Sequence, residues 1–385
     1  MTDVFRPVHP RYGEASLADV LPGVLAGLGV SGGADPLGLA AQLDGVRRVA
    51  VLLVDGLGWY QIPLAAPHAP TLADLAAAGR PITTGFPSTT PTSLVTLGTG
   101  APPGPHGVLG FRVAVPGTDR VLTHTDWRDE PDPAGWQPVP TQLERARAAG
   151  VAVTVVGRPE FARSGLTRAA NRGGAYRSAA DPQGLAREML AALRAGDGPA
   201  LVYGYHPDLD RHGHLAGVDS HSWRTAVGVV DRLLTWLVAG LPADSALLVT
   251  ADHGQLNVPL DRRIDLDADP QLRMGVRVVA GEPRVRYLHA VPGALADVLS
   301  TWRAVLGDAA WVASRDEAVA AGWFGAVPEA HLQRVGDVVV ACHESYAVLA
   351  TRTENPLESR LVAYHGSYTA AEMTIPLIAV RSRPA

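Results

Sequence analysis

The sequence predicts an α/β protein, a three-layer sandwich whose mostly parallel central sheet carries helices on both faces, with an inserted α+β subdomain. Three observations support this fold class. Apolar residues make up 47% of the 385 residues and charged residues 18%, which is enough for a large buried core. Short, continuously apolar runs alternate with longer amphipathic runs, as in chains of strand–helix–strand units. Several apolar runs end abruptly on Asp, His or Gly.

The first half of the chain supplies two strands and three helices of this pattern. Arg48–Val54 is continuously apolar after its first residue and rich in β-branched side chains, which predicts a buried parallel strand. Thr71–Gly79 is expected to form a helix with its first Thr as N-cap and its Gly just past the end. Thr92–Leu97 is expected to begin a helix, because a Thr-Pro pair precedes it. A helix over Thr141–Ala149 and a strand over Val151–Val156 follow.

The second half continues the alternation and then returns to it at the end. Asp181–Ala195 is amphipathic, and Ala200–Tyr205 reads as a strand. Ser222–Val238 is the longest helical pattern, with one apolar face. It leads into a buried strand over Ala246–Ala251. Met373–Val380 again has the composition of a core strand, so we expect it to complete the central sheet.

The pattern changes between residues 260 and 351. Val276–Val279 and Val285–His289 are expected to pair as strands around Gly281. A helix over Gly293–Leu306 and a strand over Asp337–Ala341 follow. We therefore expect residues 260–351 to form the inserted subdomain, and residues 1–259 and 352–385 to form the main core.

Composition excludes several classes of function. The formal net charge is −5, there is no lysine and no basic block, so a nucleic-acid polymer is not expected as a partner. Cys342 is the only cysteine, which excludes an internal disulfide and a thiolate metal cluster. No apolar run has the length of a membrane span, and residues 1–32 do not resemble a secretion signal. We expect a soluble, cytoplasmic protein whose metal sites, if any, use His and Asp.

Candidate metal ligands follow three of the expected strands. Asp55 ends the first strand, Asp252 and His253 end the strand over Ala246–Ala251, and Asp210 and His214 follow Ala200–Tyr205. Open α/β sheets place their sites at the carboxyl ends of parallel strands. A carboxylate and an imidazole four residues apart are able to converge on one cation and are typical zinc ligands.

Each of these residues also has a simpler interpretation. Asp55 is equally suited to capping a turn. His206, Asp208 and His212 are alternatives to Asp210 and His214 as ligands, or are solvated loop residues. A lone loop histidine such as His365 is more often structural than a ligand.

Thr90 lies at the expected start of a helix. Backbone N–H groups and the helix dipole at such a position favour an anion such as phosphate. The simpler interpretation is that Thr90 is only an N-cap, and both are compatible.

The order of these motifs resembles the alkaline phosphatase superfamily, and most closely its nucleotide pyrophosphatase/phosphodiesterase branch. That branch has a segment Phe-Pro-Thr-Lys-Thr-Phe-Pro-Asn-His, followed by Thr-Gly and His-Gly. The matching segments here are Phe86–Thr90, Thr99-Gly100 and His106-Gly107. Asp55-Gly56, Asp210-x-x-Gly213-His214, Asp252-His253-Gly254 and His365-Gly366 occur in the same order as in the superfamily, and the resemblance spans about residues 49–378.

The resemblance implies an alkaline phosphatase-like core and a role for each motif. Two Zn²⁺ ions are implied, with Mn²⁺ as an alternative: one held by Asp55, Asp252 and His253 with the nucleophile Thr90, the other by Asp210, His214 and His365. The implied reaction is hydrolysis of a phosphodiester or nucleotide pyrophosphate bond through a phosphothreonine intermediate. The implied partner is a small phosphoester substrate such as a nucleotide.

Two positions depart from the family segment. Ser93 stands where the branch has the Asn that helps to hold a phosphate oxygen, and Thr89 replaces the Lys before the nucleophile. Ser93 is therefore expected to contact substrate with one side-chain donor. Phe86 is an expected substrate contact that could stack on a base, as could Trp59, although a place in the core is the more usual role for a ring at either position.

Two related activities remain as alternatives. A phosphomonoesterase would need a cation for the additional phosphate charge, and Arg112 or Arg211 is a candidate. A manganese-dependent phosphomutase of the same superfamily is suggested by Asp55-Gly56-Leu57-Gly58, although such enzymes generally use serine. A sulfatase is disfavoured because Cys342 is far from the nucleophile position.

Overall fold

The computed structural model describes residues 3–382 and confirms a mixed α/β fold built on a mostly parallel sheet. Seven strands form this sheet, and only β17 runs antiparallel to its two neighbours. In spatial order the strands are β2 (Arg80–Thr83), β17 (Thr374–Arg381), β8 (Ser245–Thr250), β1 (Arg48–Val54), β7 (Ala200–His206), β5 (Ala152–Gly157) and β6 (Ala175–Ser178).

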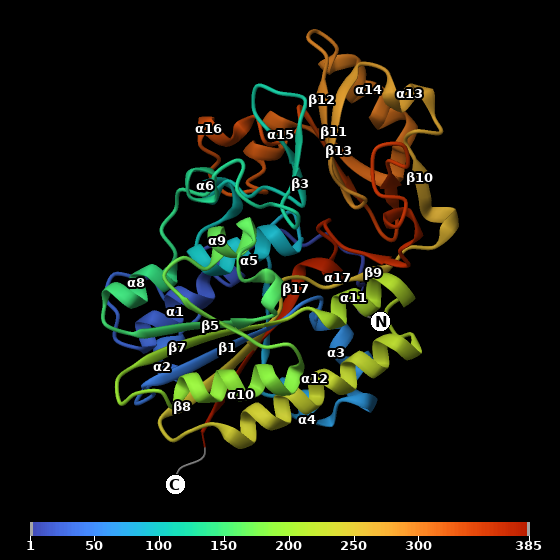
Figure 1. Ribbon diagram of the computed structural model, residues 1–385. Helices are drawn as coiled ribbons and strands as arrows, with labels where there is room; N and C mark the ends of the chain where they lie inside the picture. The colour runs from blue at the N-terminus through green and yellow to red at the C-terminus, as the bar shows by residue number, and fades with distance from the viewer. Residues whose placement is uncertain (1–2, 383–385) are drawn as a thin grey trace.

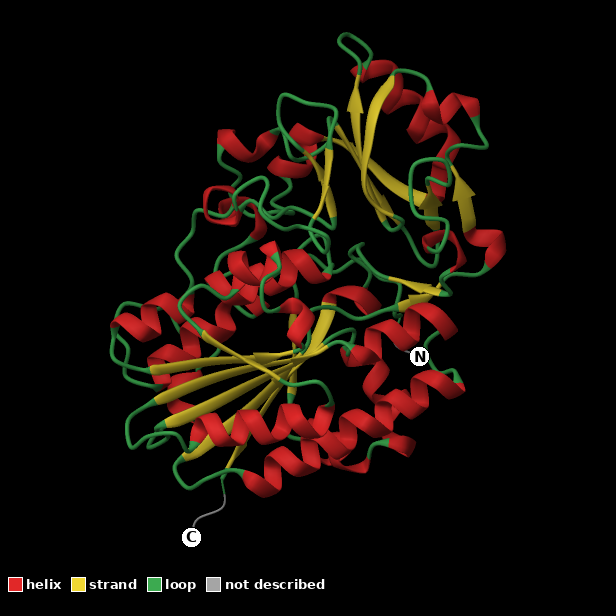
Figure 2. Cartoon of the chain, in the orientation of Figure 1, coloured by secondary structure: helices red, strands yellow, loops and turns green. Residues whose placement is uncertain are grey.

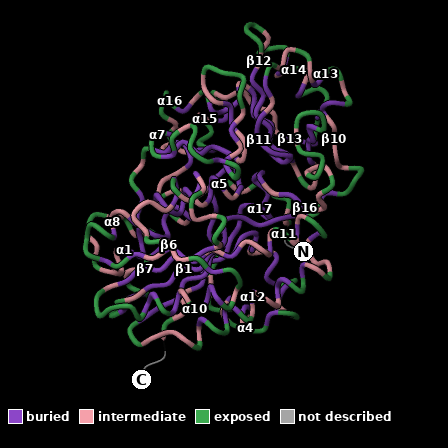
Figure 3. Tube along the Cα trace, viewed as in Figure 1, coloured by how far each residue is buried: buried purple, intermediate pink, exposed green. Residues whose placement is uncertain are grey.

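Helices cover both faces of the sheet (Figures 1 and 2). One face carries α4 (Pro70–Ala76), α10 (Pro182–Leu193) and the longest helix, α12 (His221–Gly240). The other carries α1 (Val20–Gly27), α5 (Thr90–Thr99), α8 (Gln142–Ala148) and α9 (Gly165–Ala170). Because both faces are covered, every residue of β8 and all but the first residue of β1 are buried, and Figure 3 shows the central strands inside the molecule.

A second, antiparallel sheet lies beyond one end of the central sheet (Figure 1). Its strands in order are β11 (Val276–Glu282), β12 (Val285–Ala290), β14 (Val338–Cys342) and β13 (Ala310–Ser314), and α14 (Leu295–Leu306) packs against it. The predicted pairing of the first two strands is confirmed, with Gly281 inside β11 at φ +83°.

The second sheet shares a hydrophobic core with an earlier part of the chain. The hairpin β3 (Arg112–Ala114) and β4 (Val121–Thr123) lies beside it, and Val113 joins Tyr287 in one buried cluster. The Tyr287 hydroxyl donates a hydrogen bond to the Leu109 carbonyl at 2.7 Å. The division of the chain at residues 260 and 351 stays a prediction.

Shorter elements complete the chain. The remaining helices are α2 (Leu39–Gln42), α3 (Ile62–Ala65), α6 (Pro103–His106), α7 (Pro133–Trp136), α11 (Asp208–Ala216), α13 (Pro270–Arg273), α15 (Arg315–Ala320), α16 (Glu329–Leu332) and α17 (Ala370–Met373). Two small strand pairs are β9 (Leu256–Asn257) with β16 (Ala363–Tyr364), and β10 (Arg263–Asp265) with β15 (Ala347–Leu349). Among the described residues, no helix is both long and apolar enough to cross a lipid bilayer.

The starts of two helices differ from expectation. Helix α4 begins at Pro70 with Ala69 at its N-cap, and the Thr71 hydroxyl lies 2.8 Å from that of Thr235 rather than capping the helix. Proline at the first helical position presets φ for the helix, so no capping side chain is needed to start it. Helix α5 begins at Thr90, with Thr89 at its N-cap. Thr90 is thus the first residue of the helix.

Candidate active site

Parallel register brings the first two strand ends together. Leu53 of β1 pairs with Thr250 of β8, so the residues two positions further along, Asp55 and Asp252, lie side by side. Asp252 Oδ1 accepts hydrogen bonds from the backbone N–H groups of Gly56 and His253, both at 3.0 Å. His253 Nε2 lies 3.3 Å from Asp252 Oδ2 and 3.6 Å from Asp55 Oδ1. Two carboxylates and one imidazole therefore converge at this edge of the sheet.

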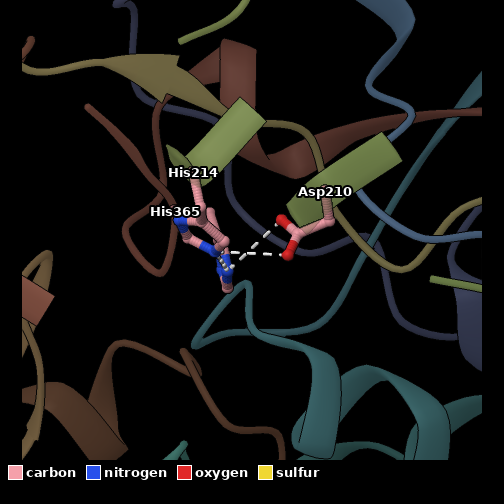
Figure 4. A group of neighbouring side chains, drawn as sticks. All are labelled: Asp210, His214 and His365. Carbon is pink, nitrogen blue, oxygen red and sulfur yellow. Dashed lines mark hydrogen bonds and ion pairs between the residues drawn. The ribbon is translucent and has the colours of Figure 1, made fainter. Parts of the chain in front are cut away.

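A second group lies beside the first (Figure 4). Asp210 and His214 are on α11, where a spacing of four residues places both on one helix face, and His365 follows β16. His214 Nε2 lies 3.2 Å from Asp210 Oδ2 and 3.2 Å from His365 Nε2. The His365 ring also stacks on that of His253, with centroids 3.6 Å apart. The two groups are thus in direct contact.

Thr90 faces the first group from the N-terminus of α5. Its Oγ1 lies 3.1 Å from His253 Nε2. The first residues of a helix leave their N–H groups without intrahelical partners, which favours an anion at this end. The Thr90 hydroxyl therefore lies beside candidate metal ligands, at a helix end that favours an anion.

The donor set suits divalent cations. Ligand atoms of Asp210, His214 and His365, and separately of Asp55, Asp210 and His253, lie within 4.8 Å of one another. The Nδ1 atoms of His214 and His365 face the carbonyls of Ala363 and Ser88 at 2.7 and 2.9 Å, an arrangement that leaves each Nε2 lone pair for a metal.

Two buried carboxylate oxygens support the same conclusion. Asp55 Oδ1 and Asp252 Oδ2 accept no hydrogen bond, although both side chains are buried. A buried carboxylate oxygen without a partner is costly, and a cation would satisfy it. Asp210 belongs to both of these groups of ligand atoms, and Asp252, which the resemblance assigns to the ion of Asp55 and His253, lies beside His253. The assignment of individual ligands to each ion stays a prediction.

Burial has the largest effect on the pKa values of Asp55, Asp210 and His365, and nearby charged groups come second. Burial and the nearby carboxylates of Asp252 and Asp210 raise the pKa of Asp55 well above its ordinary value, and the Tyr205 hydroxyl, which donates to Asp55 Oδ2, offsets this only in part. Burial alone would raise the pKa of Asp210, but His214 and His365 lower it below its ordinary value. Burial, followed by the charge of His253, lowers the pKa of His365.

A cavity of about 390 Å³ opens beside the cluster. Its polar end includes Asp55, Thr90, Asp210, His214 and His365. The rest of its wall is largely apolar and aromatic, and includes Leu94, Phe111, Phe161, Leu166, Tyr176 and Tyr205. The Phe161 and Tyr205 rings meet edge to face, with centroids 5.9 Å apart. The cavity thus has a polar end at the candidate metal ligands and a mainly apolar wall elsewhere.

The structure places the two expected substrate contacts away from this cavity. Phe86 is 1% exposed and packs against Trp323, Phe324 and Tyr368. The Ser93 hydroxyl is buried and lies 2.9 Å from that of Thr84. Neither residue lines the cavity. The surroundings of Phe86 therefore favour the core role that the sequence also allowed.

Other candidates from the sequence have structural partners. Asp208 forms an ion pair with Arg158, and His212 Nδ1 lies 2.8 Å from Ser222 Oγ. Arg112 pairs with Glu354 and Glu358, while Arg211 lines the cavity. Trp59 packs against the main core.

Two residues that donate hydrogen bonds to carboxylates of the cluster were not predicted from the sequence. Tyr205 donates to Asp55, and Gln255 Nε2 donates to Asp210 Oδ1 at 2.9 Å. Tyr205 is the last residue of an expected strand and precedes Asp210 by five residues. This position at a strand end is the one feature of the sequence that indicates a place near the site. Gln255 directly follows the Asp252-His253-Gly254 motif but carries no pattern of its own.

Solved structures of similar fold have little sequence identity to this chain. Murine ectonucleotide pyrophosphatase/phosphodiesterase 5, in an inactive form with AMP, has 20% identity and a TM-score of 0.70, with 86% of this chain and 87% of that chain covered. Phosphonoacetate hydrolase from Sinorhizobium meliloti 1021, in complex with phosphonoformate, has 20% identity and a TM-score of 0.65, with 88% and 91% covered. Comparison with curated proteins finds no match.

The model of one protein family matches most of the chain. It is described as type I phosphodiesterase / nucleotide pyrophosphatase, and it matches residues 49–368. The match begins in β1, which leads to Asp55, and extends past His365, so it contains every candidate metal ligand and Thr90. The resemblance seen in the sequence is confirmed: the chain belongs to the type I phosphodiesterase / nucleotide pyrophosphatase family, within the alkaline phosphatase superfamily.

Proposed function

We propose that this protein hydrolyses a small phosphodiester or nucleotide pyrophosphate with Thr90 as the nucleophile. The observation that carries the proposal is the position of Thr90 Oγ1. It lies 3.1 Å from His253 Nε2, at the wall of the cavity and at the N-terminus of α5. A phosphate at that helix end would place its phosphorus beside the hydroxyl.

Two Zn²⁺ ions are the proposed cofactors, with Mn²⁺ as an alternative. Asp55, Asp252 and His253 would hold one ion, and Asp210, His214 and His365 the other; ligand atoms of Asp210 lie within 4.8 Å of those of His214 and His365 and also of those of Asp55 and His253. Bound divalent cations lower the pKa of a nearby hydroxyl and offset the charge that develops on phosphate.

The proposed reaction has two displacements. In the first, the Thr90 hydroxyl gives up its proton to water, a bond forms between Oγ1 and phosphorus, and the bond to the leaving group breaks, which is an alcohol in a diester and a phosphate in a pyrophosphate. The leaving alcohol takes up a proton. In the second, water attacks the phosphorylated Thr90, the Oγ1–phosphorus bond breaks, and a phosphomonoester is released with the hydroxyl restored.

The wall of the large cavity favours a diester over a monoester. A monoester carries one more negative charge on its phosphate, and it needs additional cations to bind. Arg211 is the single arginine among the described residues that line this cavity. The remaining wall is mainly apolar, which suits an organic group attached to the phosphate.

A chelator and add-back assay tests the proposal. Protein dialysed against EDTA would be assayed with bis-p-nitrophenyl phosphate and p-nitrophenyl phosphate, before and after addition of Zn²⁺ or Mn²⁺. We expect chelation to abolish diester hydrolysis, the metal to restore it, and kcat/KM for the diester to exceed that for the monoester by about 10-fold or more. Diester hydrolysis that resists chelation, or a preference for the monoester, would overturn it.

A further inference from the structure

The side chain of Gln255 reaches Asp210 from the loop after β8. Gln255 is 3% exposed, and its Nε2 donates a hydrogen bond to Asp210 Oδ1 at 2.9 Å and lies 3.3 Å from the Asp210 carbonyl oxygen. Both neighbouring atoms are acceptors, so the amide nitrogen of Gln255, and not its oxygen, has to face them. One side chain thus holds Asp210 at its backbone and at its carboxylate.

This contact fixes which way the Asp210 carboxylate faces. Its other oxygen, Oδ2, lies 3.2 Å from Nε2 of the candidate ligand His214, one helical turn away (Figure 4). A carboxylate that rotates freely has to lose that freedom when it binds a metal. A carboxylate that a hydrogen bond already orients loses less, which is why the hydrogen-bond partners of metal ligands affect metal affinity.

Space for the amide comes from Gly213, which lies within α11. A Cβ at that position would lie 1.8 Å from Gln255 Oε1 and 2.9 Å from its Cδ, and the three nearest atoms all belong to Gln255. Glycine in a helix interior is normally less favourable than alanine. The glycine of the Asp210-x-x-Gly213-His214 motif is therefore explained by the space that the Gln255 side chain occupies.

A second buried amide supports the backbone of Gln255. Gln61 is 4% exposed, its Nε2 donates to the Gln255 carbonyl at 2.8 Å, and its Oε1 accepts from the Gly58 N–H. Gly58 lies three residues after Asp55, so the two amides connect the loop after β1 to Asp210. Within the described residues, Gln61 makes no hydrogen bond to a candidate metal ligand.

We propose that Gln255 is a positioning residue that orients the Asp210 carboxylate for metal binding, and that Gly213 is a glycine because this amide needs its space. The proposal rests on the metal-dependent function proposed above. Gln255 does not line the large cavity, so its effect on the reaction passes through Asp210 and the affinity for zinc.

The zinc affinity of two methionine variants tests the positioning role. Methionine has nearly the length of glutamine but no N–H donor, so Gln255→Met removes the hydrogen bond to Asp210 and keeps most of the packing. We expect it to weaken zinc binding about 10- to 100-fold in competition with a chromophoric chelator. Gln61→Met removes an equally buried amide that holds only the backbone of Gln255, so it is expected to lower the Tm and to keep the wild-type zinc affinity.

Alanine at position 213 tests the same contact from the other side. Gly213→Ala keeps Gln255 but places a methyl group where its amide lies, so zinc affinity is again expected to fall about 10-fold or more. In a Gln255→Ala background the methyl group has free space, and Gly213→Ala is expected to lower zinc affinity no further. An equal loss in both backgrounds would contradict the explanation of Gly213.

The outcomes separate the positioning role from the proposed function. Equal zinc affinity of the wild type and Gln255→Met would overturn the positioning role and leave the metal-dependent hydrolase intact. A wild type that binds no zinc yet hydrolyses the diester would overturn the metal-dependent function, and the positioning role with it. If Gln255→Met does not fold, Gly213→Ala decides, because wild-type zinc affinity in that variant would overturn the role equally.

Discussion

At the scale of single residues, the cluster combines groups that repel each other in the absence of cations. Asp55, Asp210 and Asp252 carry three carboxylates that meet around His253. Burial strengthens their mutual repulsion, because water no longer screens it. The same arrangement becomes favourable once positive ions lie between the carboxylates. The Thr90 hydroxyl lies beside His253 in this cluster, and the proposed chemistry depends on it.

Replacing that hydroxyl tests its role. We expect Thr90→Ala to lower kcat for diester hydrolysis by roughly 10³-fold or more, since the group that bonds to phosphorus is lost. Thr90→Ser keeps a hydroxyl at the start of α5 and is expected to retain measurable turnover. Steady-state kinetics on both variants, with metal content measured in parallel, would check this. Equal activity of Thr90→Ala and the wild type would exclude Thr90 as the nucleophile.

A second prediction concerns the shared carboxylate. Asp210 lies in both ligand groups, so Asp210→Asn is expected to lower zinc content at both sites, whereas His365→Asn should affect one. Asp208→Asn, two residues away on the same helix, removes a carboxylate that pairs with Arg158 and serves as the control. Metal analysis of dialysed protein measures the result. Full zinc content in Asp210→Asn would contradict the shared role.

At the scale of elements, the site depends on how closely helices approach. Gly98 is buried in α5, the helix that begins at Thr90, and α5 packs against α9. A Cβ at Gly98 would lie 2.0 Å from the carbonyl oxygen of Ala170, at the end of α9. The absence of a side chain there allows α5 to lie deep enough to present Thr90 to the cluster.

This contact reverses the usual effect of a helical Gly→Ala change. Alanine in a helix interior is normally favoured over glycine by about 0.5–1 kcal/mol. Gly98→Ala is instead expected to lower the free energy of unfolding by about 1–3 kcal/mol, because the Ala170 carbonyl must move. Gly228→Ala in α12, where the nearest atoms would lie 3.8 Å from the new Cβ, is expected to be neutral or stabilising. Denaturant unfolding of both variants gives the comparison, and equal effects would contradict the argument.

At the scale of the whole molecule, the site lies where the central sheet meets the second sheet. Arg284, in the turn between β11 and β12, forms a fully buried pair with Glu372 of α17, at 2.9 and 2.7 Å. Glu372 also accepts a hydrogen bond from the Ser367 N–H at 3.0 Å, two residues after His365. Through Glu372, the antiparallel sheet is therefore connected to the loop that carries the candidate ligand His365.

Metal binding is therefore expected to stabilise the whole fold. Because the candidate ligands come from α11 and from the loops after β1, β8 and β16, an unfolded chain has no comparable site. At a free Zn²⁺ concentration about 100 times Kd, one site adds about 2.7 kcal/mol. We expect Zn²⁺ to raise the Tm by several degrees and EDTA to lower it, as measured by calorimetry. An unchanged Tm would argue against resident metal ions.

Much of the fold was predictable because its signals are local. Buried strands such as β1 and β8 are continuously apolar, and the polar residues after them mark the edge where a site forms. The cluster itself follows from parallel register, which fixes Asp55 beside Asp252. The cytoplasmic location stays a prediction.

Other features depend on contacts that no local pattern records. The antiparallel direction of β17 is set by the neighbours that it joins. His206, Asp208 and His212, for which the sequence left a solvated loop open as an alternative, lie at the end of β7 and in α11. Ser93 was expected at the substrate because it stands at the family's Asn position, and Phe86 because its ring could stack on a base, yet both side chains are buried in packed surroundings. Glu282 ends β11 in the separate antiparallel sheet, so only the tertiary structure brings it beside Gly366.

The most direct test of the central claim is to trap the covalent intermediate. The zinc-loaded protein would be mixed with bis-p-nitrophenyl phosphate, quenched in acid within milliseconds to seconds, digested, and analysed by peptide mass spectrometry. We expect a p-nitrophenyl phosphoryl group on the Thr90 hydroxyl, released as p-nitrophenyl phosphate on further turnover, and no such adduct in Thr90→Ala. An adduct on another residue, or undiminished turnover by Thr90→Ala, would contradict the account.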